Sequence, residues 1–110
     1  MLTIDPAREF CVVGELRGPP PRIVCGARYV RLADPAVAEI ALTVHDDFQR
    51  QGIGRHLLRL LIEQGRRDGF RTFVADVLAT NTAMLHLLQI VAPKRRSIYS
   101  SGVSHVEWDL

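Results

Sequence analysis

Alternating apolar and polar positions occupy the first part of the chain. They predict strands at residues 10–16 and 22–32, with Gly18-Pro19-Pro20-Pro21 stopping the first, because proline lacks the donor that a sheet requires. A third strand is expected over residues 37–44, where every second residue is apolar, after a turn at Asp34-Pro35. The N-terminal part is therefore expected to be an antiparallel sheet.

From residue 54 the apolar positions recur with the period of an α-helix. The predicted buried stripe consists of Leu57, Leu58, Leu61 and Ile62. Gly69 is a suitable residue to follow the helix C-terminus, because glycine adopts the left-handed conformation found there. The pattern thus predicts an amphipathic helix with arginines on its outer side.

The C-terminal part predicts one more strand, a short helix and a hairpin. Residues 72–78 are rich in strand-forming side chains, and residues 81–91 have helical spacing with Pro93 beyond their end. The hairpin strands, 97–99 and 103–108, flank Ser101-Gly102. In it Val106, Trp108 and Leu110 are expected to share one face, and in the helix Met84, Leu85, Leu88 and Val91 are expected to face inward.

The resulting order, β-β-β-α-β-α-β-β, predicts an α/β (α+β layered) domain with a central β-α-β unit in a mixed, mainly antiparallel sheet. The length of 110 residues and a hydrophobic content of 47% fit a single globular domain over residues 1–110. A net charge of +2 and 6% aromatic residues do not favour nucleic acid or a membrane as partner.

Several other features predict an ordinary intracellular chain. No hydrophobic leader or long apolar run is present, so the cytoplasm is the expected location. Cys11 and Cys25 lie in predicted strands and are expected to be reduced core residues. The four histidines lack the helical spacing of a zinc site, and no metal is expected.

The most informative segment joins the third strand to the first helix. Gly52 and Gly54 remove side chains at the start of a helix, where unpaired N–H groups and a partial positive charge favour an anion. Arg50 and Arg55 add full positive charges. These features predict a pyrophosphate site, although a glycine turn that only begins a helix remains the alternative.

The segment Gln49-Arg50-Gln51-Gly52-Ile53-Gly54 resembles the Gln/Arg-x-x-Gly-x-Gly/Ala signature of the GCN5-related N-acetyltransferase (GNAT) superfamily. Ala38-Glu39-Ile40-Ala41 and Asn81-x-x-Met84 also lie where that superfamily has its strand 4 and the start of its helix 4. The resemblance extends from Phe10 to Leu110. Over residues 24–91 the chain is most similar to the acetyltransferase domain of bacterial protein-lysine acetyltransferases.

The resemblance implies that acetyl-CoA, the acyl donor, binds where strand 4 of the superfamily separates from strand 5. The residues implied to contact it are Leu42, Val44, Gln49, Arg50, Gln51, Gly52, Ile53, Gly54, Arg55 and Asn81. Main-chain N–H groups from Arg50 to Arg55 would hold the pyrophosphate, and the backbone near Leu42 and Val44 would pair with the pantetheine arm. Asn81 is equally suited to be a helix N-cap, and the two roles are compatible.

Glu39 is the candidate general base, since several members of the superfamily have a base at this position and an attacking amine must lose a proton. A solvated surface glutamate is the alternative. Where many members have a tyrosine that protonates the leaving thiolate, this chain has Leu88. The general acid is therefore unassigned, with Tyr99 or a water as substitutes.

The superfamily's usual first strand and first two helices have no counterpart before Phe10. A sheet without that cover is expected to expose apolar surface, which predicts a homodimer. The resemblance implies an N-acetyltransferase that passes an acetyl group from acetyl-CoA to a primary amine, a protein lysine or a small molecule, by direct attack in a ternary complex. The alternative is a non-catalytic acyl-CoA-binding or regulatory module with an incomplete acceptor site.

Overall fold

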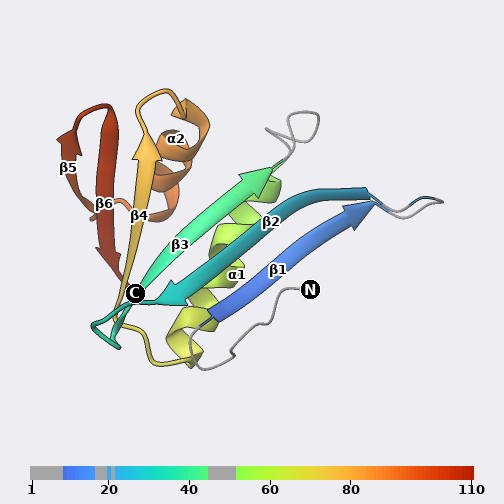
Figure 1. Cartoon of the computed structure of the whole chain (residues 1–110), viewed down its shortest axis with the longest axis horizontal. Coiled ribbons are helices and arrows are strands. Elements are labelled where there is room, and N and C mark those ends of the chain that lie inside the picture. Colours follow the sequence, from blue (N-terminus) through green and yellow to red (C-terminus); the bar gives the residue numbers. More distant parts are fainter. Residues whose placement is uncertain (1–8, 17–19, 21, 45–51) are drawn as a thin grey trace.

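A computed structural model of the chain describes residues 9–16, 20, 22–44 and 52–110. In this part of the chain the predicted order of elements is confirmed (Figure 1). The elements are β1 (Glu9–Leu16), β2 (Arg22–Arg31), β3 (Val37–Val44), α1 (Ile53–Arg67), β4 (Thr72–Leu78), α2 (Thr82–Val91), β5 (Arg96–Ser100) and β6 (Val103–Asp109). Each boundary lies within two residues of the sequence prediction.

The strands form one sheet in the order β1-β2-β3-β4-β6-β5. All neighbouring strands are antiparallel except β3 and β4, which are parallel. The parallel pair follows from its connection, because a chain that leaves β3 and crosses over through α1 re-enters the sheet in the same direction. The predicted mixed, mainly antiparallel sheet with a central β-α-β unit is thus confirmed.

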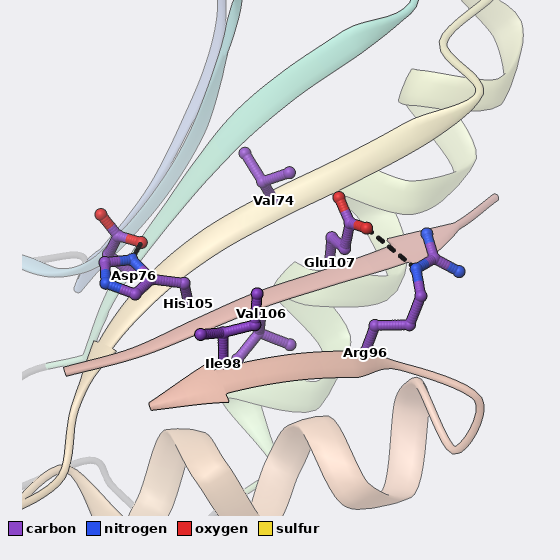
Figure 2. A pocket seen from close by; sticks show the side chains of 7 residues that line it. All are labelled: Val74, Asp76, Arg96, Ile98, His105, Val106 and Glu107. Atoms are coloured by element: carbon purple, nitrogen blue, oxygen red, sulfur yellow. Dashed lines mark hydrogen bonds and ion pairs between the residues drawn. The ribbon is translucent and has the colours of Figure 1, made fainter. Parts of the chain in front are cut away.

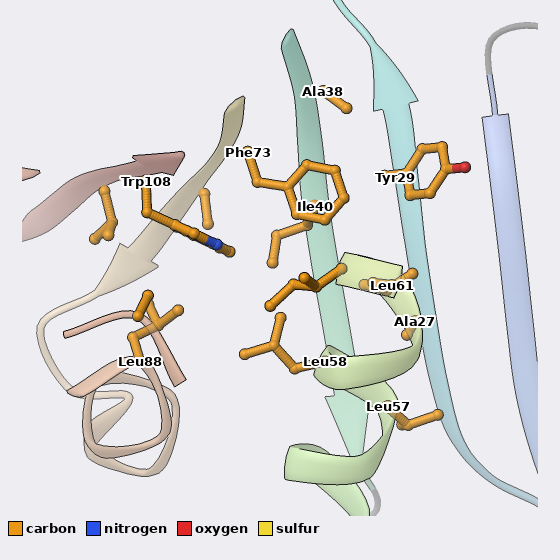
Figure 3. Packing of buried hydrophobic residues seen from close by; sticks show 14 of the residues in the cluster. Ala27, Tyr29, Ala38, Ile40, Leu57, Leu58, Leu61, Phe73, Leu88 and Trp108 are labelled. Carbon is orange, nitrogen blue, oxygen red and sulfur yellow. The ribbon is translucent and has the colours of Figure 1, made fainter. Parts of the chain in front are cut away.

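Both helices pack on one face of the sheet. Leu58 and Leu61 of α1, Leu88 of α2 and Phe73 of β4 have no exposed surface, and Figure 3 shows these side chains gathered between helices and strands. Burial of each such side chain contributes on the order of 2 kcal/mol to folding. The apolar stripe predicted for α1 from its helical spacing is therefore the face that packs into the core.

The opposite face of the sheet, here called the outer face, has no helix over it in the described part of the chain. Alternation and strand register place on it Arg28 and Val30 of β2, Glu39, Ala41 and Thr43 of β3, Thr72, Val74, Asp76 and Leu78 of β4, Arg96 and Ile98 of β5, and His105, Glu107 and Asp109 of β6. Most of these side chains are exposed. Exposed apolar residues on this face include Leu78 and Ile98, with 61% and 72% of their surface accessible.

Aromatic rings connect the strands on the helix side. Tyr29 stacks on Phe10 with ring centroids 5.4 Å apart and meets Phe70 edge-on at 5.1 Å. Phe73 lies 5.6 Å from Tyr29 and meets Trp108 edge-on at 5.9 Å. Such pairs add about 0.5–1.5 kcal/mol each beyond their burial. The few aromatic residues of the chain thus join β1, β2, β4 and β6 into one core.

Residues with positive φ angles follow α1 and form the turn between β5 and β6. Gly69 has φ +85°, its N–H donates to the Arg66 carbonyl at 3.2 Å, and the Phe70 N–H donates to the Gly65 carbonyl at 3.0 Å. This is a Schellman motif, and it confirms Gly69 as the residue after the helix. Ser101 and Gly102 have φ 52° and 80°, the two positive values of a type I′ turn.

The prediction for the two cysteines is half right. Cys25 is buried, but Cys11 is exposed, and both are free thiols. The reason is the register of β1: its neighbours Phe10 and Val12 pack against the core, so the alternating Cys11 side chain lies on the other side, opposite Arg28. Cys11 therefore lies in a strand, as predicted, but its side chain is on the exposed face of that strand.

Candidate functional site

The two central strands, β3 and β4, separate, as the resemblance implies for strands 4 and 5 of the superfamily. β3 pairs with β4 only from Val37–Thr72 to Glu39–Val74, whereas β3 stays paired with β2 as far as Val44 and β4 with β6 as far as Leu78. Figure 1 shows the two strands diverging beyond this point. Beyond the start of this divergence, here called the fork, the backbones of β3 and β4 no longer pair with each other. It lies where the resemblance predicts the acyl donor.

The N-terminus of α1 stands at the open end of the fork. Gly52 is its N-cap residue, with φ +79°, and its carbonyl accepts a hydrogen bond from His56 N–H at 3.0 Å. Among the described residues, no side chain caps this terminus and the first turn has no acidic residue. The first N–H groups of the helix, up to that of Arg55, are therefore available to an anion. Gln49, Arg50 and Gln51 lie outside the described residues.

Gly54 brings the helix terminus close to the strand and to α2. A methyl group at this position would lie 3.4 Å from Leu87 and 3.7 Å from Leu42, which is ordinary contact. Val44 is at 4.0 Å. The predicted cofactor residues Leu42, Val44, Ile53 and Gly54 are thus brought together, with the side chains of Leu42, Val44 and Ile53 packed against the core. Arg55 is exposed on the first turn.

Asn81 is the N-cap of α2, as its alternative interpretation predicts. Its Oδ1 accepts a hydrogen bond from Met84 N–H at 3.1 Å, and its own N–H donates to the Leu78 carbonyl at 2.9 Å. These bonds fix the start of α2 directly after the end of β4, next to the fork. A contact between Asn81 and the cofactor remains a prediction.

Glu39 lies at the base of the fork. It is the last β3 residue paired with β4, and its side chain is exposed on the outer face. Among the described residues its carboxylate has no hydrogen bond or ion pair, so it is open to a substrate that approaches from that face. Leu88, at the position of the superfamily's tyrosine, is completely buried, and Tyr99 is 67% exposed on β5. Neither gives the fork a general acid.

A second polar cluster lies on the outer face beside the fork, and it could not be found from the sequence. His105 Nδ1 lies 2.6 Å from Asp76 Oδ1, and Arg96 bonds Glu107 at 2.9 Å and Asp109 at 3.1 Å. The hydrogen bond from Arg96 lowers the pKa of Asp109. Alternation could have assigned each residue to a face, but the pairs depend on the register between β4, β5 and β6.

Two of the cavities in the described part of the chain lie outside the fork. One, of about 200 Å³, lies on the outer face over β4, β6 and β5 (Figure 2). The other, of about 400 Å³, lies near the C-terminal ends of α1 and α2 with Trp108 in its wall. The described residues contain no group of three or more acidic, histidine or cysteine side chains placed to hold a metal ion. Neither α1 nor α2 is long and apolar enough to cross a membrane.

Comparison with known proteins agrees with this geometry. The sequence profile of the "Acetyltransferase (GNAT) family" matches residues 3–90. Acetyltransferase Pat of Mycolicibacterium smegmatis is 40% identical over 67 residues, which are 60% of this chain and 20% of Pat. The [ribosomal protein bS18]-alanine N-acetyltransferase of Salmonella typhimurium is 33% identical over 100 residues, covering 73% of this chain and 68% of that protein.

The fold is also that of a solved structure, the GNAT domain of S. lividans PAT. It superposes with a TM-score of 0.82 at 24% identity, over 98% of this chain and 64% of that one. At this identity the likeness shows that the two chains share a fold. This chain spans only a fifth of the length of the M. smegmatis relative. From the matching profile, the fold and the fork, we conclude that the chain belongs to the acetyltransferase (GNAT) family.

Proposed function

We propose that this chain binds acetyl-CoA in the fork and transfers its acetyl group to a primary amine. The observation that carries the proposal is the end of β3–β4 pairing at Glu39–Val74, in a fork whose open end faces the N-terminus of α1. Strand backbone that no longer pairs across the fork suits the amide groups of a pantetheine arm, and a helix N-terminus suits a pyrophosphate. The residues available at the fork therefore fit both ends of the donor.

Each predicted residue has a defined part in this proposal. Main-chain N–H groups from Arg50 to Arg55 hold the pyrophosphate, and Gln49 and Gln51 contact the donor. The backbone at Leu42 and Val44 pairs with the pantetheine arm. Asn81 contacts the donor near its thioester through the amide nitrogen that its capping bond leaves free.

Glu39 accepts the proton that the amine must lose, directly or through a water. Acetyl-CoA supplies an activated carbonyl: the amine nitrogen forms a bond to that carbon, the carbon–sulfur bond breaks, and the sulfur leaves with the electron pair as CoA thiolate. In this proposal the donor enters past α1, whereas the amine reaches Glu39 from the outer face. Both substrates are therefore bound at the same time, and the amine attacks the donor directly in a ternary complex. No side chain is assigned to protonate the thiolate.

Donor binding is tested by calorimetric titration of acetyl-CoA and CoA into the wild type, Arg55→Glu and Arg59→Glu. Both arginines are exposed on α1, one turn apart, so the two variants carry the same charge change. Charge reversal at Arg55 should weaken binding about tenfold, and reversal at Arg59 should change it less than threefold, because the pyrophosphate lies at the first turn. A folded wild type that binds neither ligand would refute the proposal.

A non-catalytic acyl-CoA-binding module is the second candidate, and the buried Leu88 favours it. Glu39→Gln separates the two candidates, with Glu63→Gln on α1 as the control for loss of one exposed carboxylate. For an enzyme, Glu39→Gln should bind acetyl-CoA normally and lose about a hundredfold in turnover, as expected for loss of a general base. Equal turnover of Glu39→Gln and wild type would remove Glu39 from the mechanism.

The proposal includes self-association of the chain through the edge strand β5. All five β5 residues are exposed, and Ile98 and Tyr99 expose 72% and 67% of their surface. Ile98 also lines the cavity on the outer face, so a second copy paired along β5 would add a wall to the acceptor side of the sheet.

A further inference from the structure

Asp76 and His105 form a fixed pair beside the opening of the fork. They lie directly opposite each other in the register of β4 and β6, with Oδ1 and Nδ1 2.6 Å apart (Figure 2). Asp76 is two residues beyond Val74, the last β4 residue paired with β3, and it shares the outer face with Glu39. The imidazole thus orients a carboxylate whose second oxygen, Oδ2, remains open to a ligand.

The cavity next to this pair has the size of one side chain. Its volume is about 200 Å³, below the roughly 300–1,000 Å³ of small-molecule sites. Val74 and Ile98 give it apolar walls, and Asp76 and Glu107 contribute carboxylates. Arg96, which is paired with Glu107, and His105, which is paired with Asp76, also line it. An apolar stem with a charged end fits this arrangement, because such side chains bury their methylene groups and keep the charge in water.

The charges around the cavity favour a cation. Four carboxylates lie on the outer face of β3, β4 and β6, namely those of Glu39, Asp76, Glu107 and Asp109. Arg96 is the one lysine or arginine in the described strands β3 to β6, and it is already engaged by Glu107 and Asp109. An anion would therefore meet uncompensated negative charge, whereas a cation would be attracted.

We propose that Asp76, oriented by His105, selects an acceptor segment that carries a positive side chain about three residues from the reacting amine. The spacing follows from the order of strands in the sheet. The cavity lies over β4, β6 and β5, and the middle one of these strands, β6, is two strand spacings from β3, which carries Glu39. Two strand spacings are roughly 10 Å, the length of about three residues of extended peptide. The acceptor class is thus a basic protein segment. The inference rests on the proposed function, since it concerns the acceptor of that same fork.

The test uses two fluorescent peptides with a single lysine and, three residues away, either arginine or its uncharged isostere citrulline. Affinity is measured by anisotropy in the presence of CoA, and kcat/KM by release of CoA from acetyl-CoA. The wild type should bind the arginine peptide about tenfold more tightly than the citrulline peptide. Asp76→Asn should abolish that preference through KM, while Glu63→Gln on α1 should retain it.

His105 is tested as a positioning residue through rescue by a conservative variant. His105→Ala should reduce the arginine preference, and His105→Gln, which keeps an N–H donor for Asp76, should restore most of it. Urea unfolding of both variants should give a midpoint close to that of the wild type, a result that general loss of folding would not give.

The failure of this inference can be distinguished from failure of the proposed function. If acetyl-CoA binds but the wild type does not prefer the arginine peptide, or Asp76→Asn keeps the preference, Asp76 does not select the acceptor. If Asp76→Asn impairs acetylation of spermidine but of neither peptide, the acceptor is a polyamine and the inference of a protein segment is wrong. Absence of acetyl-CoA binding in the calorimetric titration would instead refute the function itself.

Discussion

Gly52 and Gly69 have nearly the same backbone conformation but different surroundings. Their φ angles are +79° and +85°, and a methyl group at either position would touch nothing within 4 Å. The left-handed conformation costs a residue with a side chain roughly 1–2 kcal/mol. The two glycines differ in their position along α1: Gly52 is the N-cap residue at the fork, whereas Gly69 follows the opposite end of the helix.

We therefore expect Gly52→Ala and Gly69→Ala to lose similar stability, about 1–2 kcal/mol each in urea unfolding. Only Gly52→Ala should also weaken acetyl-CoA binding, because relief of the strain would turn the first N–H groups of α1 away from the pyrophosphate. Calorimetry on both variants checks this. Equal affinity in the two variants would show that the Gly52 conformation does not shape the donor site.

The buried Tyr29 hydroxyl donates a hydrogen bond to the Asp68 carboxylate. Burial and this bond raise the pKa of Tyr29 well above its ordinary value of 10. The unfolded chain therefore loses the tyrosine proton first as the pH rises through 10, and the free energy of unfolding falls above that pH.

Urea unfolding between pH 8 and pH 11 should show this loss in the wild type but to a smaller extent in Tyr29→Phe, which has no proton to release. The difference should reach up to about 1.4 kcal/mol per pH unit above pH 10. At pH 8 the variant should be the less stable one, because the hydrogen bond from Tyr29 to Asp68 is lost. Parallel pH dependences would contradict this account.

At the scale of elements, α1 packs on β4 through a position without a side chain. A methyl group on Gly65 would lie 2.5 Å from Cζ of Phe73, whose side chain is fully buried and has little room to move. The same group on Gly54, at the other end of the helix, would meet its nearest neighbour at 3.4 Å. The two glycines of α1 therefore differ in how tightly the helix approaches its neighbours.

Gly65→Ala should lower the free energy of unfolding by about 1–2 kcal/mol, since overpacking exceeds the gain in helix propensity. Gly54→Ala should be as stable as the wild type or more so. Chemical denaturation of both variants with the same fitted slope measures the difference. A stable Gly65→Ala would mean that α1 can shift on the sheet.

The elements were predictable because their signals are local. The stripe of α1, the alternation in β3 and the Gly69 stop depend only on neighbouring residues, and each is confirmed. The end of β3–β4 pairing was anticipated through the resemblance, not from periodicity. The Asp76–His105 pair and the exposure of Cys11 depend on strand register and on which strand lies at an edge, and a single sequence does not reveal these.

At the scale of the whole molecule, charges of opposite sign predominate on the two faces of the described sheet. The outer face of β3, β4 and β6 is acidic, whereas Arg55, Arg59, Arg66 and Arg67 lie on α1 on the other side. An anionic donor and a cationic acceptor would each approach the face of opposite charge. The two substrates can therefore enter without crossing each other's path.

Self-association is expected at the same scale, through the exposed edge β5. Sedimentation velocity over a hundredfold dilution should show dimers that dissociate, and Tyr99→Glu should yield monomers, because it places charge on the edge. Val13→Glu is the matched control, since Val13 is 56% exposed on β1, the opposite edge. A monomer at every concentration would refute association, and disruption by Val13→Glu alone would move the interface to β1.

The fork also determines how fast particular backbone amides of β3 exchange their hydrogens with solvent, and this rate can be measured without any acceptor. Between Ile40 and Thr43, every second N–H of β3 points away from β2 toward β4, which has already diverged, so no hydrogen bond between β3 and β4 covers it. Such amides exchange with deuterated solvent far faster than their neighbours in the same strand. A bound pantetheine arm would slow this alternate set alone, so hydrogen exchange would record occupancy residue by residue along one strand.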